Sequence, residues 1–288
     1  MDFIKPMLCI DDIEKFKKHT PLEFATYQYK LDGVRCIIHY ENGQVTYYSR
    51  NHKVYNNFHK FNRFISYLAE DLKEIYGLQE PLIFDGEVTD KTGEFQKVMT
   101  QVRRLENINP DIFQLHLFDL VIDEEYWKRA FCLNISYFVA KEWIECHGDE
   151  IEVFVVKNYE LKSYEDDYLK QILQEALDKG YEGVILKNLL ASYEFKRSNY
   201  WCKIKEEKTI DLPVMNVIEG KGKYQGTLGA LVCLLPNGKE IKIGSGFTDL
   251  ERIKFWNQVP KIIEVKYQGW TKGGSLRFPV FKRIREDV

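Results

Sequence analysis

Cysteine is scarce in this sequence and is not arranged to hold a metal or a disulfide framework. The six cysteines include no C-x-x-C pair, and the two closest, Cys132 and Cys146, are fourteen positions apart. Closely paired cysteines mark zinc sites and small disulfide-rich folds. We therefore expect neither of these, and we expect a reducing compartment inside a cell.

Long hydrophobic runs are also missing. No stretch approaches the roughly 18 apolar residues of a membrane span, and residues 1–6 lack the basic and apolar regions of a signal peptide. These absences favour a cytoplasmic protein without a membrane partner.

No sign of charge dominates the whole chain. Its 288 residues contain 41 Lys+Arg and 44 Asp+Glu, a net charge of −3, which excludes a basic tail or an acidic disordered segment as the main feature. The total hides an asymmetry, because residues 1–211 carry 28 basic and 37 acidic residues, whereas residues 212–288 carry 13 and 7, giving −9 and +6. A basic module beside an acidic one suits binding of a polyanion, since phosphate affinity depends on local charge. Unevenly charged solvated surfaces explain the asymmetry equally well at this point.

Hydrophobic periodicity alternates between strand and helix in the first two thirds. Residues 25–29, 34–40 and 45–48 predict a strand meander with turns at Asp32-Gly33 and Asn42-Gly43. Helical spacing of apolar residues predicts helices over 58–76, 95–105, 126–147 and 164–179, and short apolar runs predict strands at 82–84, 87–88, 112–121, 182–187 and 200–205. This interleaving predicts an α+β domain whose strand ends meet at one cleft.

The pattern changes after Leu212-Pro213. Short glycine-punctuated runs predict strands at 213–219, 229–235, 240–243 and 262–267, with a helix at 249–257. Several short strands in under eighty residues indicate a small closed β-barrel of the OB type. We therefore divide the chain into domains at 1–210 and 211–288, with a hinge near residues 208–211.

The hexapeptide KLDGVR at 30–35 places a lysine after an apolar-aromatic segment. Lysine is a strong nucleophile only when deprotonated, so a catalytic lysine needs desolvation or neighbouring cations, or a metal that offsets its charge. Alone, this hexapeptide also fits a surface hairpin. Four segments follow it in order, however: FDGE at 84–87, LFD at 117–119, EGVILK at 182–187 and WCKIK at 201–205.

In this order the segments resemble motifs I, III, IIIa, IV and V of the covalent nucleotidyltransferases, which comprise DNA ligases, RNA ligases and mRNA capping enzymes. The tail RFPVFKRIRED at 277–287, with GSGF at 244–247, resembles the OB domain of the smallest ATP-dependent DNA ligases. The resemblance covers essentially the whole chain. It implies an α+β, ATP-grasp-like adenylation domain followed by a small β-barrel OB-fold domain.

The resemblance also implies the chemistry. Lys30 would attack the α-phosphorus of ATP, AMP would pass from this lysine to the 5′-phosphate of a nick, and the 3′-hydroxyl would expel it. The cofactors would be ATP and Mg²⁺, with Mn²⁺ as an alternative. Glu87 would contact the ribose or a metal and Glu182 would support metal binding, because Mg²⁺ is held by one or two carboxylates plus phosphate oxygens.

Further nucleotide contacts follow from the same resemblance. Phe118 would stack on adenine, and Lys203 and Lys205, alternate residues of one strand, would both reach the α-phosphate. Gln28 stands two positions before the nucleophile, where many relatives have a Glu or Thr that reads the adenine edge. The implied nucleotide-binding set is Gln28, Tyr29, Arg35, Arg50, Glu87, Phe118, Lys203 and Lys205.

Nicked double-stranded DNA is the implied partner, bound by a monomer. Arg50 would engage the 5′-phosphate of the nick or the AMP, and the further DNA-binding candidates are Lys221, Lys223, Lys242, Arg277 and Arg285. Without room for an added clamp, we expect a minimal ligase whose DNA binding is steeply salt-dependent. The tail departs from the motif VI ending R-x-D-K because Val288 follows Asp287, so Lys282 or Arg283 would take the place of the lysine.

Three alternatives stay open. An RNA ligase shares the first five motifs, although the RFPVF segment at 277–281 within an OB domain favours a DNA ligase. A capping guanylyltransferase shares the lysine motif but would prefer GTP. A non-catalytic nick- or end-binding protein is disfavoured, because it would not need all of Lys30, Glu87, Glu182, Lys203 and Lys205.

Overall fold

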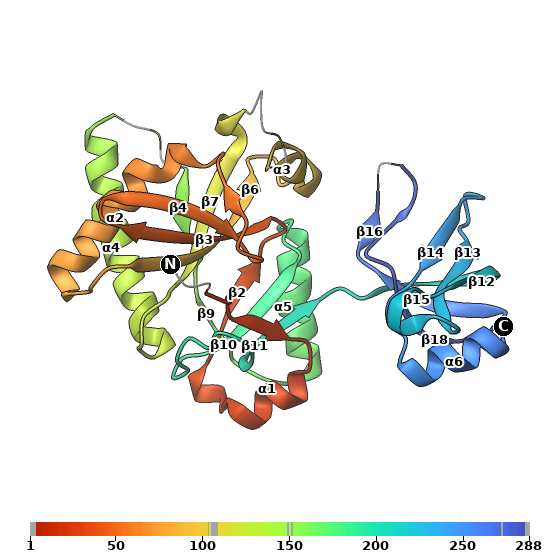
Figure 1. Ribbon diagram of the computed structural model, residues 1–288. Coiled ribbons are helices and arrows are strands. Elements are labelled where there is room, and N and C mark those ends of the chain that lie inside the picture. The colour runs from red at the N-terminus through yellow and green to blue at the C-terminus, as the bar shows by residue number, and fades with distance from the viewer. Residues whose placement is uncertain are drawn as a thin grey trace. The chain divides into compact units, whose positions relative to one another are not determined.

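The computed structural model describes residues 4–102, 104, 109–148, 150, 152–271 and 273–285. The chain divides into two compact units, Met1–Lys205 and Glu206–Val288, shown in Figure 1. Within the described part of the chain, no helix is long and apolar enough to cross a membrane.

A six-stranded sheet forms the first half of the larger unit. Its order is β5 (Val54–Tyr55), β4 (Gln44–Ser49), β3 (Val34–Glu41), β6 (Leu82–Asp90), β7 (Phe113–Leu120) and β8 (Val153–Val155). All neighbours are antiparallel except β7 and β8. Helices α2 (Asn62–Tyr76) and α4 (Tyr126–Cys146) pack together and bury the main apolar core against this sheet, and α3 (Phe95–Val102) lies against β6 and β3 (Figure 1).

A five-stranded sheet forms the other half of this unit. Its order is β1 (Leu8–Ile10), β11 (Arg197–Lys205), β10 (Gly183–Asn188), β2 (Ala25–Lys30) and β9 (Tyr159–Glu160). Helices α1 (Ile13–His19) and α5 (Asp166–Asp178) pack on it. The predicted helices therefore occur, although two begin later than expected, at Asn62 and Asp166; the predicted end of the helix over 95–105 lies partly outside the described residues.

The predicted strand meander is wrong at its first turn. β2 and β3 belong to different sheets, so Asp32-Gly33 carries the chain from one sheet to the other. Alternating apolar residues identify a strand but not its partner, which explains the error. Glycine is required at position 33, because an added Cβ would lie 2.4 Å from the Val88 carbonyl oxygen. The second predicted turn is confirmed: Asn42 and Gly43, with φ of 51° and 73°, join β3 to β4.

The smaller unit contains a five-stranded antiparallel sheet in the order β14 (Glu240–Ile243), β13 (Leu228–Leu234), β12 (Lys208–Glu219), β15 (Ile262–Tyr267) and β18 (Val280–Ile284). A ribbon of β16 (Gly269–Trp270) and β17 (Leu276–Arg277) and helix α6 (Asp249–Asn257) complete it. β12 begins before the predicted position 213: residues 208–213 pair with β15 and residues 214–219 pair with β13. This shared strand curves the sheet around one apolar core.

The barrel is not closed by a full ladder among the described strands, since the order ends at β14 and β18. One backbone hydrogen bond, from Phe281 N to Ser245 O at 2.9 Å, links the chain after β14 to β18. Phe247 also stacks on Phe281 with ring centroids 4.6 Å apart. The two segments that suggested an OB domain, at 244–247 and 277–287, are therefore in direct contact.

Candidate active site

Most of the sequence motifs of the larger unit meet at one cavity of about 110 Å³. Its walls come from strands of both sheets, together with residues from loops. The lining residues are Cys9, Gln28, Tyr29, Lys30, Leu31, Arg35, Glu87, Phe118, Val156, Ile185, Lys187 and Trp201. Six of the predicted nucleotide-binding or catalytic positions are thus brought together, although they span residues 28 to 118.

Lys30, the last residue of β2, lies at this cavity and forms an ion pair with Glu182. The pairing of β2 with β10 sets this contact, because Lys30 is opposite Gly183 and the Glu182 amide donates to the Lys30 carbonyl at 2.8 Å. Gly183 has φ of 154°, and an added Cβ would lie 2.2 Å from the Ile204 carbonyl oxygen. The EGVILK segment therefore needs its glycine to place Glu182 beside the lysine.

Two carboxylates hold Lys30 in its charged form. Burial acts to lower the pKa of Lys30, but Glu182 and Glu87 outweigh it, and the pKa is raised. Burial acts to raise the pKa of Glu182, but Lys30 and Lys205 outweigh it, and that pKa is lowered. The side chains as they stand therefore form a stable ammonium–carboxylate pair rather than a free nucleophile.

The two lysines of the WCKIK segment differ in their partners. Lys205 reaches the other oxygen of Glu182, with Nζ 3.3 Å from Oε1. Lys203 pairs with the exposed Asp11 at 3.6 Å. Burial raises the pKa of the Cys9 thiol, while Arg35, Lys187, Lys30 and Lys203 act to lower it. These four cations therefore surround Cys9, and their positive charge suits phosphate.

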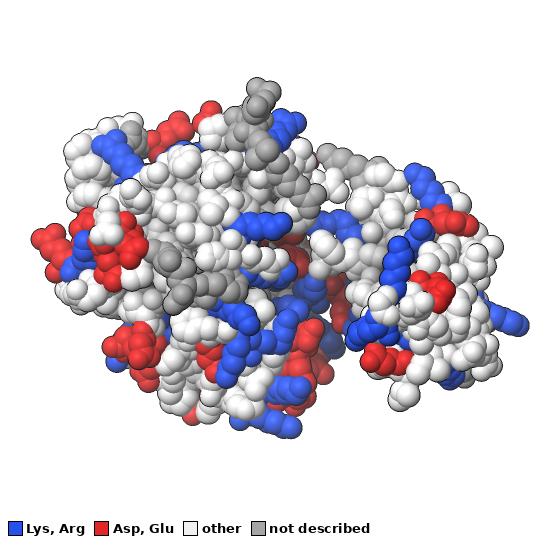
Figure 2. Space-filling model, viewed as in Figure 1, with Lys and Arg blue, Asp and Glu red and all other residues white. Residues whose placement is uncertain are grey.

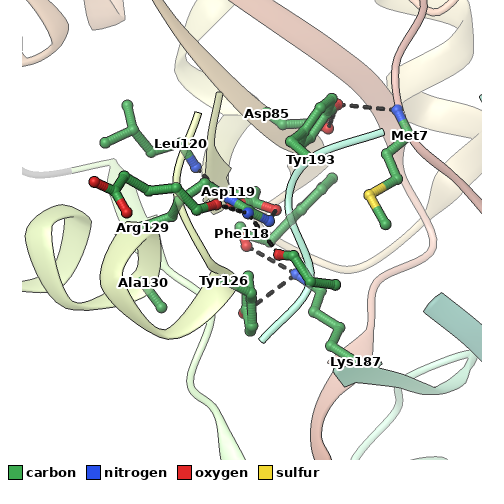
Figure 3. A network of polar contacts seen from close by, with 12 residues as sticks. Met7, Asp85, Phe118, Asp119, Leu120, Tyr126, Arg129, Ala130, Lys187 and Tyr193 are labelled. Carbon is green, nitrogen blue, oxygen red and sulfur yellow. Dashed lines mark hydrogen bonds and ion pairs between the residues drawn. The ribbon is translucent and has the colours of Figure 1, made fainter. Parts of the chain in front are cut away.

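Arg35 is held by a carboxylate that sequence reasoning missed. Its Nε and Nη2 donate to the two oxygens of Asp85 at 2.6 and 2.5 Å, and Nη2 also donates to the Met7 carbonyl at 2.9 Å. Tyr193 donates its hydroxyl to the same Asp85 (Figure 3). The Arg35 guanidinium lies 4.9 Å from the centre of the Phe118 ring. In this geometry Arg35 packs against the Phe118 ring. A contact between Arg35 and a phosphate would be additional to its bonds with Asp85 and Met7.

The aromatic wall consists of Phe118 and Trp201, whose rings meet edge to face at 6.1 Å. Lys187 lies behind it, 1% exposed, and its Nζ donates to the Phe118 carbonyl at 2.9 Å (Figure 3). Burial lowers the pKa of Lys187 to about 7. Lys187 and Trp201 are site residues that sequence reasoning missed, although both stand inside the motif segments; their polar and apolar neighbours become visible only in the fold.

Of the two carboxylates predicted to hold a metal, Glu87 lines the cavity and Glu182 pairs with Lys30, which also lines it. No group of three or more His, Cys, Asp or Glu suited to a metal occurs among the residues described. Burial raises the pKa of Glu87 to about 7, against the opposing influence of Lys30 and Arg35. Two carboxylates with phosphate oxygens fit the preference of Mg²⁺, and a divalent cation would favour the ionised form of Glu87.

The predicted DNA contacts are spread over both units. Arg50 is exposed in the turn between β4 and β5 and does not line the cavity. In the smaller unit, Lys221 and Lys242 are exposed, while Lys223 lies 4.0 Å from Asp249. Figure 2 shows basic and acidic side chains interspersed on the visible face of this unit. A DNA-binding role for these residues stays a prediction.

The basic residues of the tail mostly have acidic partners. Arg285 pairs with Asp211 at 2.9 Å, and the Arg277 guanidinium lies 5.9 Å from the centre of the Phe278 ring. Glu264 binds both Lys282, at 3.0 Å, and Arg283, at 2.5 Å. Hydrogen bonds from these two cations lower the pKa of Glu264 to about 2. Lys282 and Arg283 therefore form part of the β15–β18 surface. Either residue would have to break its ion pair with Glu264 before it could act in place of a motif VI lysine.

Two family models match the chain. One describes an ATP dependent DNA ligase domain and matches residues 6–205; the other describes a DNA ligase OB-like domain and matches residues 219–285. Among curated relatives, a DNA ligase of Haemophilus influenzae is 30% identical over 209 positions, covering 72% of this chain and 73% of the relative. A DNA ligase of Archaeoglobus fulgidus is 28% identical over 302 positions, covering 91% of this chain and 52% of the relative. The chain thus spans about half the length of the archaeal relative.

Solved structures share the fold. The structure named Pmar-Lig_PreS3 has a TM-score of 0.79 and 28% identity, covering 99% of this chain and 68% of that chain. A structure from a study of Lig E DNA ligases has a TM-score of 0.75 and 23% identity, covering 99% of this chain and 100% of that chain. The second likeness bears on the fold alone: an α+β domain followed by an OB-like domain.

Proposed function

Because this chain belongs to the ATP-dependent DNA ligase family, we propose that it seals nicks in duplex DNA with ATP, through an AMP attached to Lys30. The observation that carries the proposal is the position of Lys30, which lines the cavity where the motif segments meet and forms an ion pair with Glu182. The adenylation domain is proposed to span residues 1–210 and the DNA-binding OB domain residues 211–288.

In the first step, the Lys30 nitrogen forms a bond to the α-phosphorus of ATP and the bond to pyrophosphate breaks. The attacking amine must be neutral. Glu182 now holds it as an ammonium, so the ion pair has to open and the nitrogen has to lose a proton before attack. Lys205, 3.3 Å from the other oxygen of Glu182, remains to balance that carboxylate when Lys30 leaves it.

Glu87 and Glu182 would hold Mg²⁺, and when bound this ion would neutralise charge on the triphosphate and the leaving pyrophosphate. The residues of the chain orient the rest of the nucleotide. Phe118 offers an aromatic face to the adenine, with Ile185 also in the cavity wall. Arg35 and Lys203, like Lys30, add positive charge near Cys9 in the cavity wall, which favours an anionic ligand.

In the later steps, AMP moves to the 5′-phosphate at a nick and the 3′-hydroxyl then expels it. Nicked double-stranded DNA is the proposed substrate, bound by one copy of the protein. Arg50, Lys221, Lys223, Lys242, Arg277 and Arg285 are the proposed DNA contacts. The net charge of +6 in residues 212–288 supplies general attraction to the duplex.

The test is sealing of a singly nicked duplex with a labelled 5′-phosphate. We expect a ligated product with ATP and Mg²⁺, and none with Lys30→Ala. Lys170→Ala is a matched control, because Lys170 is an exposed lysine on α5 that pairs only with Asp167 among the contacts described. Sealing of nicked RNA alone would support an RNA ligase, and covalent labelling by GTP alone would support a guanylyltransferase. Sealing that survives Lys30→Ala would overturn the proposal.

A further inference from the structure

The buried hydroxyl of Tyr126 joins three side chains behind the cavity. Tyr126, at the first turn of α4, is 0% exposed. Its oxygen lies 2.8 Å from Asn158 Oδ1, 3.1 Å from Gln28 Nε2 and 3.3 Å from Lys187 Nζ. A tyrosine hydroxyl has one proton to donate and two lone pairs. It donates to Asn158 and accepts from Gln28 and Lys187, so its hydrogen-bonding capacity is filled.

These bonds fix which end of the Gln28 amide faces the cavity. Gln28 is 3% exposed, and its Nε2 also donates to the Val156 carbonyl at 3.1 Å. Both amide protons are therefore used by the protein. A flipped amide would set Oε1 against the Val156 carbonyl and against a hydroxyl whose proton is already donated. Among the residues that the structure describes, none donates a hydrogen bond to Gln28 Oε1, although Gln28 lines the cavity.

Lys187 connects this arrangement to the aromatic wall. Its Nζ donates both to the Phe118 carbonyl and to the Tyr126 hydroxyl (Figure 3). An amine retains two protons when neutral, so both bonds persist in either charge state. Lys187 and Tyr126 thereby link the Phe118 backbone in β7 to the Gln28 side chain through hydrogen bonds.

We propose that Tyr126 is a positioning residue that sets purine selectivity, by holding Gln28 with Oε1 as an acceptor toward the nucleotide base. An adenine has a 6-amino donor to meet this acceptor, whereas a 6-oxo purine sets an oxygen against it. A site built around one such hydrogen bond discriminates strongly, because the wrong ligand leaves buried polar groups unpaired. This inference rests on the proposed function, since it concerns the same nucleotide.

The test compares ATP with inosine triphosphate, which differs from ATP at the 6-position. The readout is kcat/KM for formation of the covalent protein–nucleotide adduct, followed by intact-protein mass spectrometry. Wild type should strongly prefer ATP, and Tyr126→Phe should reduce the ATP-to-ITP ratio by about tenfold or more, because one of the two contacts that fix the Gln28 amide is then lost and only the bond to the Val156 carbonyl opposes a flip. Tyr47→Phe is the matched control: Tyr47 is also buried, with one hydroxyl bond to Asn62 at 2.9 Å, and its loss should leave the ratio unchanged.

Asn158→Ala provides a second variant at a half-buried position, where folding is less at risk. It frees the Tyr126 proton for a flipped Gln28 and should lower the ratio in the same direction. An unchanged ratio in folded Tyr126→Phe and Asn158→Ala, even with a fall in overall rate, overturns the inference. Equal use of ATP and ITP by wild type overturns it as well. Absence of any adduct with either nucleotide in wild type contradicts the proposed function instead.

Discussion

Lys30 and Glu182 face each other across the β2–β10 pairing, with their side chains only 25% and 21% exposed. The residues are 152 positions apart in sequence, yet the backbone bond from Glu182 to Lys30 fixes their proximity. This ion pair keeps Lys30 in its ammonium form and holds the Glu182 carboxylate next to it. Lys30, the proposed nucleophile, would therefore have to be released from this ion pair before it could attack.

Glu182→Gln should lower the pKa of Lys30. Burial already acts to lower the pKa of Lys30, and the neutral glutamine side chain of the variant would remove the negative charge that most strongly opposes this effect. The measurement is NMR titration of protein with ¹³C-methylated lysines, with Lys170 as an unaffected reference. A Lys30 pKa that stays the same or rises in Glu182→Gln would show that Glu182 is not its main partner.

Glu87→Gln should lose activity but gain stability at high pH. The folded pKa of Glu87, about 7, exceeds its value of about 4.3 in an unfolded chain. Ionisation therefore costs stability, and this cost grows as the pH rises from about 4 and is complete above about 7. We expect the free energy of unfolding of Glu87→Gln relative to wild type to increase by about 2–3 kcal/mol between pH 5 and pH 8. Urea unfolding at the two pH values measures it, and a difference that does not change with pH would refute the buried-carboxylate account.

ATP should protect Cys9 from alkylation. Cys9 lines the cavity, whereas Cys146 is exposed at the end of α4. Mass spectrometry after limited treatment with a maleimide should show slower modification of Cys9 when ATP is present, and no change at Cys146. Equal rates at Cys9 with and without ATP would mean that the nucleotide binds elsewhere.

Gly183→Ala should destabilise the larger unit by about 2–4 kcal/mol. The new Cβ would meet the Ile204 carbonyl at 2.2 Å and would push β10 away from β11. Gly148→Ala is the comparison: its φ of 76° is also strained, but no atom lies within 4 Å of the added Cβ. Thermal unfolding should show a larger loss at Gly183, and equal losses would indicate that the close packing of β10 on β11 is unimportant.

Much of this architecture is predictable from the sequence, because the strand and helix periods are clear and the motif segments are conspicuous. The order of the segments at 30–35, 84–87, 117–119, 182–187 and 201–205 indicates one site, and Lys30, Glu87 and Phe118 do line one cavity. The partner of each strand is harder to predict, since an alternating pattern only identifies a half-buried strand. For this reason the sequence pattern predicts one meander for β2 and β3, although the two strands belong to different sheets.

The contacts that Tyr126 and Asp85 make with cavity residues could not be predicted from the sequence, although Asp85 stands inside the FDGE segment. Tyr126 lies at the start of a helix and Asp85 inside a strand, and neither position is marked by periodicity. Their importance comes from burial and from hydrogen bonds to residues 98 and 50 positions away, Gln28 and Arg35. Local sequence patterns do not indicate which residues so far apart in the chain come into contact.

The central claim is that Lys30 carries AMP. Wild-type protein incubated with ATP and Mg²⁺ should gain the mass of one AMP, and peptide mapping should locate it on Lys30. Lys30→Ala should gain none, while Lys170→Ala should gain one as wild type does. An AMP found on another residue, or an adduct that persists in Lys30→Ala, would contradict the account.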